Sequence, residues 1–213
     1  MTLVVGILGP PCSGKSTLAK SLQSYGGVWI DADSIAKEQL DEPEVSDALI
    51  EMFGDQILDE RRQLNRSAIA SLVFGDDPSS QRRLRQLESV IHPRVRRIIH
   101  ERLRDLIRAQ QRWAILDVPL LIESGWSLVC DEILCVRVAK EIHMQLIANR
   151  GWTIDELVRR QQRQIADTLK QRHATRIIDN SGDPAGWREQ IESWWLAIEM
   201  QSGNHDPDPQ HCR

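Results

Sequence analysis

A glycine-rich segment near the start of the chain has the residue types and spacing that bind phosphate groups. Residues 9–16 read Gly-Pro-Pro-Cys-Ser-Gly-Lys-Ser and fit the pattern G-x-x-x-x-G-K-[ST]. In this pattern backbone N–H groups hold the β-phosphate of a nucleotide, Lys15 neutralises the β and γ oxygens, and the Ser16 hydroxyl faces Mg²⁺. The residues expected to contact the nucleotide are Gly9, Pro11, Cys12, Ser13, Gly14, Lys15, Ser16 and Thr17.

Two aspartates, Asp31 and Asp33, follow the second predicted strand. The period of two along an extended segment places both carboxylates on one side, at the carboxyl end of the sheet. One of them can act as a base toward a substrate hydroxyl, and Asp33 is our candidate catalytic residue. The alternative is that Asp33 or Ser34 only caps the next helix.

Other charged residues allow a functional and a structural interpretation. Asp117 ends the third predicted strand, where a carboxylate can act on Mg²⁺, or it is a simple turn residue. The cations of residues 159–163 belong to a mobile lid over the transferred phosphate or to an exposed helix. The ten arginines of residues 82–112 either bind a phosphate-rich ligand or a nucleic acid, or they form a solvated helix face. His92 is a substrate contact or a local histidine.

Short apolar runs separated by helical patterns must position these residues, and they predict an α/β fold. About five parallel strands are expected in a doubly wound, three-layer sheet. The runs are Leu3 to Leu8, Gly27 to Ile30, Trp113 to Val118, Glu132 to Val138 and Arg176 to Ile178.

Two long stretches without strand signals are predicted to be helical insertions over the active-site end of the sheet. Residues 34–111 form the first, in which an amphipathic helix is expected to start after a break at Pro93, and residues 140–173 form the second, a lid. The core would then be residues 1–33, 112–139 and 174–200 of a single domain, 1–200. A last helix, Pro184 to Met200, precedes a tail, 201–213, that is expected to be disordered.

The composition restricts the classes of protein further. The 27 Lys and Arg against 31 Asp and Glu give a net charge of −4, which argues against a dedicated nucleic-acid binder. No apolar run approaches the roughly 18 residues that span a bilayer, so we expect a cytoplasmic protein. The four cysteines show no C-x-x-C pair and are expected to be reduced thiols. No obligate protein partner is evident.

Beyond the phosphate-binding loop, the order and gaps of several motifs resemble the dephospho-CoA kinase family from Leu3 to about Gly182. The first group of similar segments is Ile30-Asp31-Ala32-Asp33, Phe53-Gly54 with Ile57-Leu58, Leu64-Asn65-Arg66 before Val73-Phe74, and Leu87-Glu88 before His92-Pro93. The second group is Asp117-Val118-Pro119-Leu120-Leu121 with Glu123, Arg160 with Gln164, Lys170 with Arg172, and Asp179-Asn180-Ser181-Gly182.

The resemblance implies a P-loop kinase that uses ATP to phosphorylate the ribose 3′-hydroxyl of dephospho-CoA, the last step of coenzyme A synthesis. It implies Asp33 as the base, Arg66 and His92 as substrate-side residues, and a lid around Arg150 and Arg160, with Arg160 on the nucleotide.

The chain departs from the family pattern at three places. They are Pro10-Pro11-Cys12 in a loop that is usually glycine-rich, Thr175 at a common aspartate, and Leu146 where a lid arginine is expected. We expect Arg150 to replace that arginine as a catalytic group.

Rival interpretations are another nucleotide or small-metabolite P-loop kinase, and a nucleotide-binding homologue with weak catalysis. A regulatory GTPase would need N-K-x-D, and residues 180–183, Asn-Ser-Gly-Asp, lack the lysine.

Overall fold

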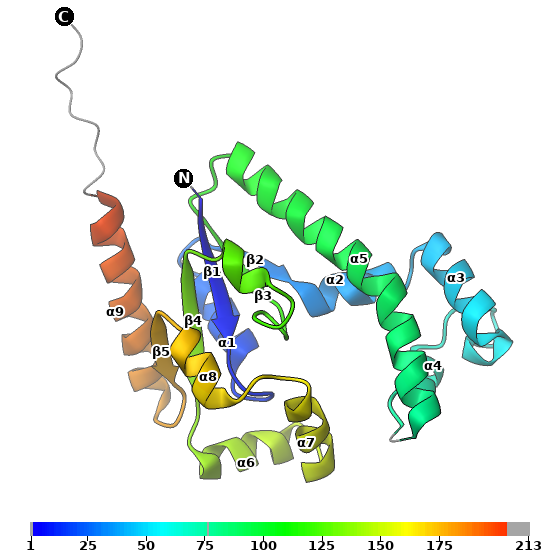
Figure 1. Cartoon of the computed structure of the whole chain (residues 1–213). Coiled ribbons are helices and arrows are strands. Elements are labelled where there is room, and N and C mark those ends of the chain that lie inside the picture. Colours follow the sequence, from blue (N-terminus) through cyan, green and yellow to red (C-terminus); the bar gives the residue numbers. More distant parts are fainter. Residues whose placement is uncertain (1, 76, 204–213) are drawn as a thin grey trace, which may run out of the picture. The chain divides into compact units, whose positions relative to one another are not determined.

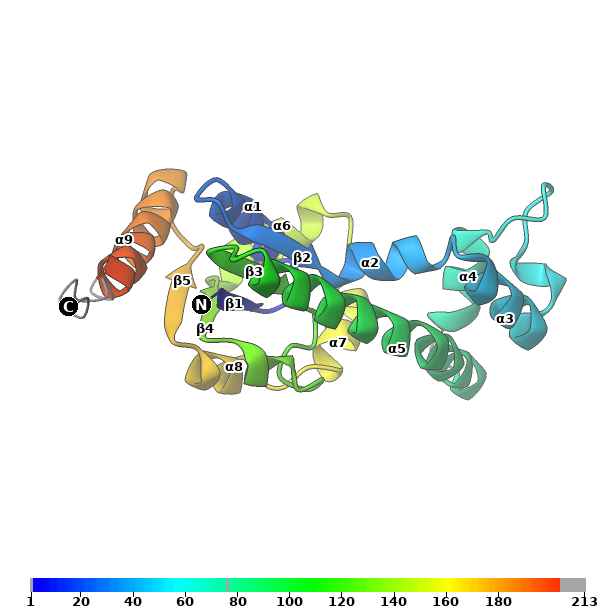
Figure 2. The ribbon, with the colours of Figure 1, turned by 90° about the horizontal axis from the view of Figure 1, so that it is seen from above.

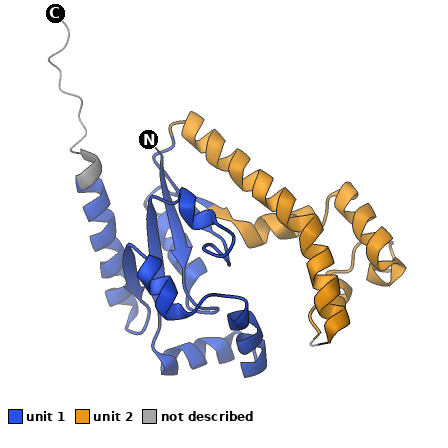
Figure 3. Cartoon of the chain, in the orientation of Figure 1, with its two compact units in different colours: residues 1–29, 111–213 blue, residues 30–110 orange. Residues whose placement is uncertain are grey.

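The chain folds into two compact units. The computed structural model describes residues 2–75 and 77–203. Unit 1 comprises residues 1–29 and 111–213, and unit 2 comprises residues 30–110 (Figure 3).

A five-stranded sheet with the order β2-β3-β1-β4-β5 forms the centre of the α/β fold (Figure 1). Parallel pairing joins β1 to β3, β1 to β4, and β4 to β5. The strands are β1 Leu3–Leu8, β2 Val28–Asp31, β3 Trp113–Asp117, β4 Glu132–Arg137 and β5 Arg176–Asp179. Each lies within one residue of its predicted bounds, so the predicted fold class is confirmed.

Helices occupy the connections between these strands. The helices of unit 1 are α1 Lys15–Gln23, η2 Trp126–Val129, α6 Lys140–Asn149, α7 Ile154–Gln162, α8 Asp167–His173 and α9 Pro184–Gly203. The helices of unit 2 are α2 Ala32–Gln39, α3 Pro43–Phe53, η1 Asp55–Ile57, α4 Arg66–Val73 and α5 Pro78–Arg108. Within unit 1, α1 and α8 lie on opposite sides of the sheet (Figure 2).

The core of unit 1 follows from the alternation of side chains along its strands. Val5 and Ile7 of β1 point to the face that α1 and α9 cover, and the cluster there includes the almost fully buried Trp113 and Trp194. On the other face, Gly6 leaves no room for a side chain, because an added Cβ would lie 2.7 Å from Cys130 Sγ. Both faces are therefore closely packed, and the ends of the strands are fixed.

The long helix α5 of unit 2 differs from the prediction. Residues 78–108 form one helix with Pro93 inside it, so the expected break at this residue is wrong. A proline there removes one hydrogen bond and costs about 3 kcal/mol. Ile91 and Val95, on either side of Pro93, both join the apolar cluster with α3 and α4, and this burial outweighs the cost.

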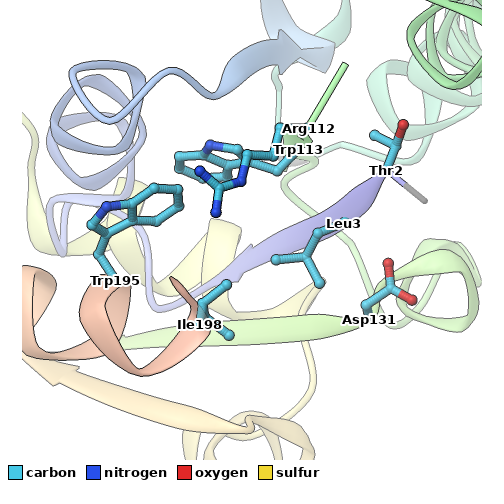
Figure 4. Close-up of a pocket in the computed structure, with 7 residues that line it drawn as sticks. All are labelled: Thr2, Leu3, Arg112, Trp113, Asp131, Trp195 and Ile198. Atoms are coloured by element: carbon cyan, nitrogen blue, oxygen red, sulfur yellow. The ribbon is translucent and has the colours of Figure 1, made fainter. Parts of the chain in front are cut away.

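Helix α9 continues through Gly203, three residues beyond the predicted end, and the rest of the predicted tail lies outside the described residues. The helix is attached to the sheet at the start of the strands. Arg112 pairs with Glu199 at 2.6 Å, and its guanidinium lies 5.5 Å from the Trp195 ring centroid. A hollow beside this contact, lined in part by Leu3 and Trp113, marks the end of the sheet opposite the phosphate-binding loop (Figure 4).

Candidate active site

The phosphate-binding loop connects the end of β1 to the start of α1, as predicted. Gly9 has φ +150, and an added Cβ would lie 2.7 Å from Ser13 Oγ and 2.9 Å from the Val136 carbonyl oxygen. Gly14 has φ +102 and starts α1 without any side-chain cap. Because the first N–H groups of a helix lack partners within that helix, this end of α1 offers donors to a phosphate.

Cys12 takes a strained conformation in the loop. Its φ of 61 is in the left-handed region, which costs a non-glycine residue about 1–2 kcal/mol. Burial raises the pKa of the Cys12 thiol, while the charges of Arg150 and Lys15 and a hydrogen bond from Arg150 act against that rise. The thiol therefore stays protonated at neutral pH, and cations surround it.

Lys15 bonds the loop on which it stands. Its Nζ donates to the Gly9 carbonyl at 3.1 Å and to the Pro10 carbonyl at 2.9 Å. The ammonium group thus lies over the backbone of the loop, where the pattern predicts that it meets phosphate oxygens.

Two side chains from distant parts of the sequence hold the loop. Asn180 Nδ2, beyond the end of β5, donates to the Ser13 carbonyl at 2.8 Å. His143 Nε2, on α6, lies 2.6 Å from the Pro11 carbonyl oxygen, and because a carbonyl only accepts, this nitrogen carries the proton. Sequence reasoning assigned no role to either residue, although Asn180 belongs to a segment that carries the family resemblance.

Two arginines of the segment predicted to form a lid, Arg150 and Arg160, converge on one tryptophan beside the loop. The guanidinium carbon of Arg150 lies 5.0 Å and that of Arg160 lies 4.2 Å from the ring centroid of Trp152. The charges of Arg150 and Arg160 also act on the pKa of the Cys12 thiol, so both side chains lie near the loop. The structure thus brings together Arg150, Arg160 and the loop, whereas Trp152 was not predicted.

Residues 164–170, in the segment predicted to form a lid, contact the segment that follows Asp117, the last residue of β3. Gln164 Nε2 donates to the Pro119 carbonyl at 3.3 Å, and the Ile165 N–H donates to Glu123 Oε1 at 2.6 Å. The buried Lys170 bonds Gln164 Oε1 at 2.7 Å. Segments that lie far apart in the sequence and carry the family resemblance therefore contact one another.

Thr175, which departs from the pattern of the resembling family, is hydrogen-bonded to β4. Its Oγ1 accepts from the Ile133 N–H at 3.0 Å and contacts Glu132. The hydroxyl thus ties the start of β5 to β4.

The remaining predicted residues belong to unit 2. Asp31 ends β2, and its Oδ1 accepts from the N–H groups of Asp33 at 2.9 Å and Ser34 at 3.1 Å. Asp33 lies in the first turn of α2, so the prediction that both carboxylates lie on one extended segment is wrong. The chain turns into a helix at once because Asp31 caps it, and the capping role considered for Asp33 belongs to Asp31.

The two predicted substrate-side residues have different surroundings within unit 2. Arg66 Nη2 bonds both carboxylate oxygens of Asp41 at 2.9 Å and the Lys37 carbonyl at 3.2 Å. His92 is exposed in the middle of α5, next to Pro93, instead of at a helix boundary.

Residues 2–75 and 77–203 contain no group of three or more His, Cys, Asp or Glu side chains that could hold a metal ion. Among these residues, too, no helix has the length and apolar character needed to cross a bilayer.

A phosphate-binding loop between the first strand and the first helix of a parallel sheet, with Arg150 and Arg160 beside it, is typical of P-loop kinases. The family model of dephospho-CoA kinase matches residues 3–185. The chain belongs to the dephospho-CoA kinase family.

Individual relatives are similar over almost the whole chain. The dephospho-CoA kinase of Rhodopirellula baltica is 47% identical over 201 residues, which cover 94% of this chain and 93% of that protein. The dephospho-CoA kinase of Bacillus licheniformis is 34% identical over 204 residues, which cover 93% of this chain and 100% of that protein. The crystal structure of TT1252 from Thermus thermophilus superposes with a TM-score of 0.75 at 31% identity, covering 92% of this chain and 97% of that one.

Proposed function

We propose that this chain transfers the γ-phosphate of ATP to the ribose 3′-hydroxyl of dephospho-CoA, giving coenzyme A and ADP. The observation that carries the proposal is the family match across residues 3–185, which includes an intact phosphate-binding loop.

The geometry of the loop supports the nucleotide part of the proposal. The uncapped start of α1 and the ammonium group of Lys15, which lies over the loop, are proposed to bind the phosphate oxygens. Mg²⁺ would be held by the Ser16 hydroxyl, with Asp117 as a second candidate, and when bound it would neutralise charge on the phosphates. Contacts of Thr17 with the nucleotide stay a prediction.

Asp33 is proposed as the base that takes the proton of the acceptor hydroxyl. Asp31 accepts the two N–H groups at the start of α2, and this supports a role for Asp33 other than capping. Arg66 and His92 are proposed to bind the acceptor. On binding the acceptor, Arg66 would give up its ion pair with Asp41. Because this ion pair is exposed, losing it costs little free energy.

Positive charge beside the loop supports transfer and not only binding. In phosphoryl transfer, charge spreads over the oxygens of the moving group, and cations that are already in place stabilise it. Arg150 and Arg160 are proposed to act in this way, with Arg150 in place of the arginine that Leu146 replaces.

The test is an ADP-release assay of the purified protein with ATP and Mg²⁺, comparing dephospho-CoA with a panel of nucleoside monophosphates. We expect dephospho-CoA to be preferred, and Asp33→Asn to abolish turnover while ATP binding is retained. Asp47→Asn, an exposed position on α3, is the matched control and should keep the activity. A nucleoside monophosphate as the better acceptor would show that the proposed substrate is wrong.

Several properties stay predictions. They are a cytoplasmic location, the absence of nucleic-acid binding and the absence of an obligate protein partner.

A further inference from the structure

The corner between α6 and α7 fixes the backbone of Trp152 from both sides. At the end of α6, the Gly151 N–H bonds the Ala148 carbonyl at 2.9 Å and the Trp152 N–H bonds the Ile147 carbonyl at 3.2 Å. With Gly151 at φ 72, this is the hydrogen-bond pattern of a Schellman motif. Thr153 then caps α7, its Oγ1 accepting from the Glu156 N–H at 3.2 Å. The indole therefore starts from a rigid two-helix corner.

The indole ring is the shared contact of two side chains that come from different helices. Arg150 stands at the end of α6, and Arg160 stands near the end of α7. Their guanidinium carbons lie 5.0 and 4.2 Å from the ring centroid, within the distance at which the face of an indole attracts a cation.

Each arginine has a second contact that fixes its direction. The guanidinium of Arg150 lies beside the thiol of Cys12 in the phosphate-binding loop. Arg160 Nε donates to Glu156 Oε1 at 2.7 Å, one turn back on its own helix. Long cationic side chains lose rotamer freedom when they become ordered, and two like charges repel each other. The Trp152 ring attracts both arginines, and this attraction offsets part of the entropy loss and part of the repulsion before the nucleotide binds.

Packing alone does not account for a tryptophan here. Trp152 is half-buried. Among the residues that the structure describes, it is not part of the apolar cluster in the core of unit 1. A leucine would cover the same end of α6, whereas only an aromatic face attracts guanidinium groups.

We propose that Trp152 is a positioning residue for phosphoryl transfer: its ring orders Arg150 and Arg160 so that both reach the phosphate groups held by the loop. This inference rests on the proposed function, because it assigns the arginines to the transferred phosphoryl group.

The test compares Trp152→Leu with Trp152→Phe by steady-state kinetics of ADP release. The acceptor is whichever of dephospho-CoA and the monophosphates the unmodified protein uses, so a wrong acceptor in the proposed function does not affect this test. Trp152→Leu should lower kcat about tenfold, the size expected for two partly exposed cation–π contacts, and change KM for the acceptor less than twofold. Trp152→Phe should retain most of the kcat, because it keeps an aromatic face.

Three further measurements separate positioning from simple folding effects. In a variant that carries Arg150→Ala and Arg160→Ala, Trp152→Leu should cause no further loss of kcat. Ile154→Ala, at an exposed position in the same corner, should stay within twofold of the unmodified protein. Without turnover, Trp152→Leu should weaken the binding of ADP with Mg²⁺ and aluminium fluoride, a mimic of the transferring phosphoryl group, about tenfold more than that of ADP alone.

The proposal is overturned if Trp152→Leu keeps its kcat and its affinity for the aluminium fluoride complex. It is also overturned if Trp152→Phe is as impaired as Trp152→Leu, or if the loss persists undiminished when both arginines are absent.

Discussion

Gly14 and Asn180 offer a quantitative test of how the loop is held. Gly14→Ala places a side chain at φ +102, with its Cβ 2.7 Å from Asn180 Nδ2. The backbone strain is about 1–2 kcal/mol. Asn180 must also move, and its hydrogen bond to the Ser13 carbonyl, 2.8 Å long, is lost at about 1 kcal/mol. Alanine restricts the unfolded chain and returns about 0.5 kcal/mol, which leaves a destabilisation of about 2 kcal/mol.

Gly26→Ala is the matched control, because Gly26 has φ +89 and nothing within 4 Å of an added Cβ. Gly26→Ala introduces the backbone strain without a clash, so it should lower the free energy of unfolding by about 1 kcal/mol. For a chain of this size each kcal/mol lowers Tm by roughly 2–4 °C, so we expect drops of about 4–8 °C for Gly14→Ala and about 2–4 °C for Gly26→Ala.

A double-mutant cycle isolates the contact between the two residues. In an Asn180→Ala background the clash disappears, so Gly14→Ala should then cost only about 1 kcal/mol, like Gly26→Ala. The free energies of unfolding come from urea titrations followed by circular dichroism. If Gly14→Ala costs the same in both backgrounds, Asn180 does not restrict Gly14, and the account of the loop is wrong.

Three further predictions concern other parts of the molecule. Arg150→Ala should reduce turnover much more than the affinity for ATP, as measured by ADP release and calorimetry, and unchanged turnover would contradict its role in the lid. Trp113→Ala, at a side chain that is 1% exposed, should lower the free energy of unfolding by about 3–5 kcal/mol in urea titrations, and a loss below about 1 kcal/mol would contradict its place in the core. Burial raises the pKa of Asp179, but hydrogen bonds from Ser181 and Arg137 outweigh it and hold the pKa below the ordinary 3.8. The ionised carboxylate therefore stabilises the fold above pH 3.8, and this contribution is lost as the pH falls through the pKa of the folded state. The difference in free energy of unfolding between the unmodified protein and Asp179→Asn should become smaller on acidification. A difference that does not change with pH would contradict the lowered pKa of Asp179.

The sequence predicted the sheet and the loop because both depend on neighbouring residues. The apolar run Leu3 to Leu8 followed by Gly9 and Gly14 specifies strand, turn and helix with contacts that span only a few positions. The same local rules gave the wrong result at Pro93, where burial of side chains on both sides maintains a helix that local preference would end. They also placed Asp33 in an extended segment, although Asp31 caps a helix that starts at Ala32, one residue before Asp33.

The contacts that organise the site were decided by the tertiary structure alone. Asn180 lies 167 residues from Ser13 along the chain, and His143 lies 132 residues from Pro11. No motif in the sequence marks Trp152. Both arginines reach its ring because helices α6 and α7 meet at a corner there. The sequence by itself determined that a phosphate-binding loop would form between a strand and a helix, because local backbone preferences and hydrophobic periodicity are enough for that. Which side chains contact the loop and the nearby arginines depended on how the sheet and helices α6 and α7 pack, because packing brings together residues that no local pattern relates.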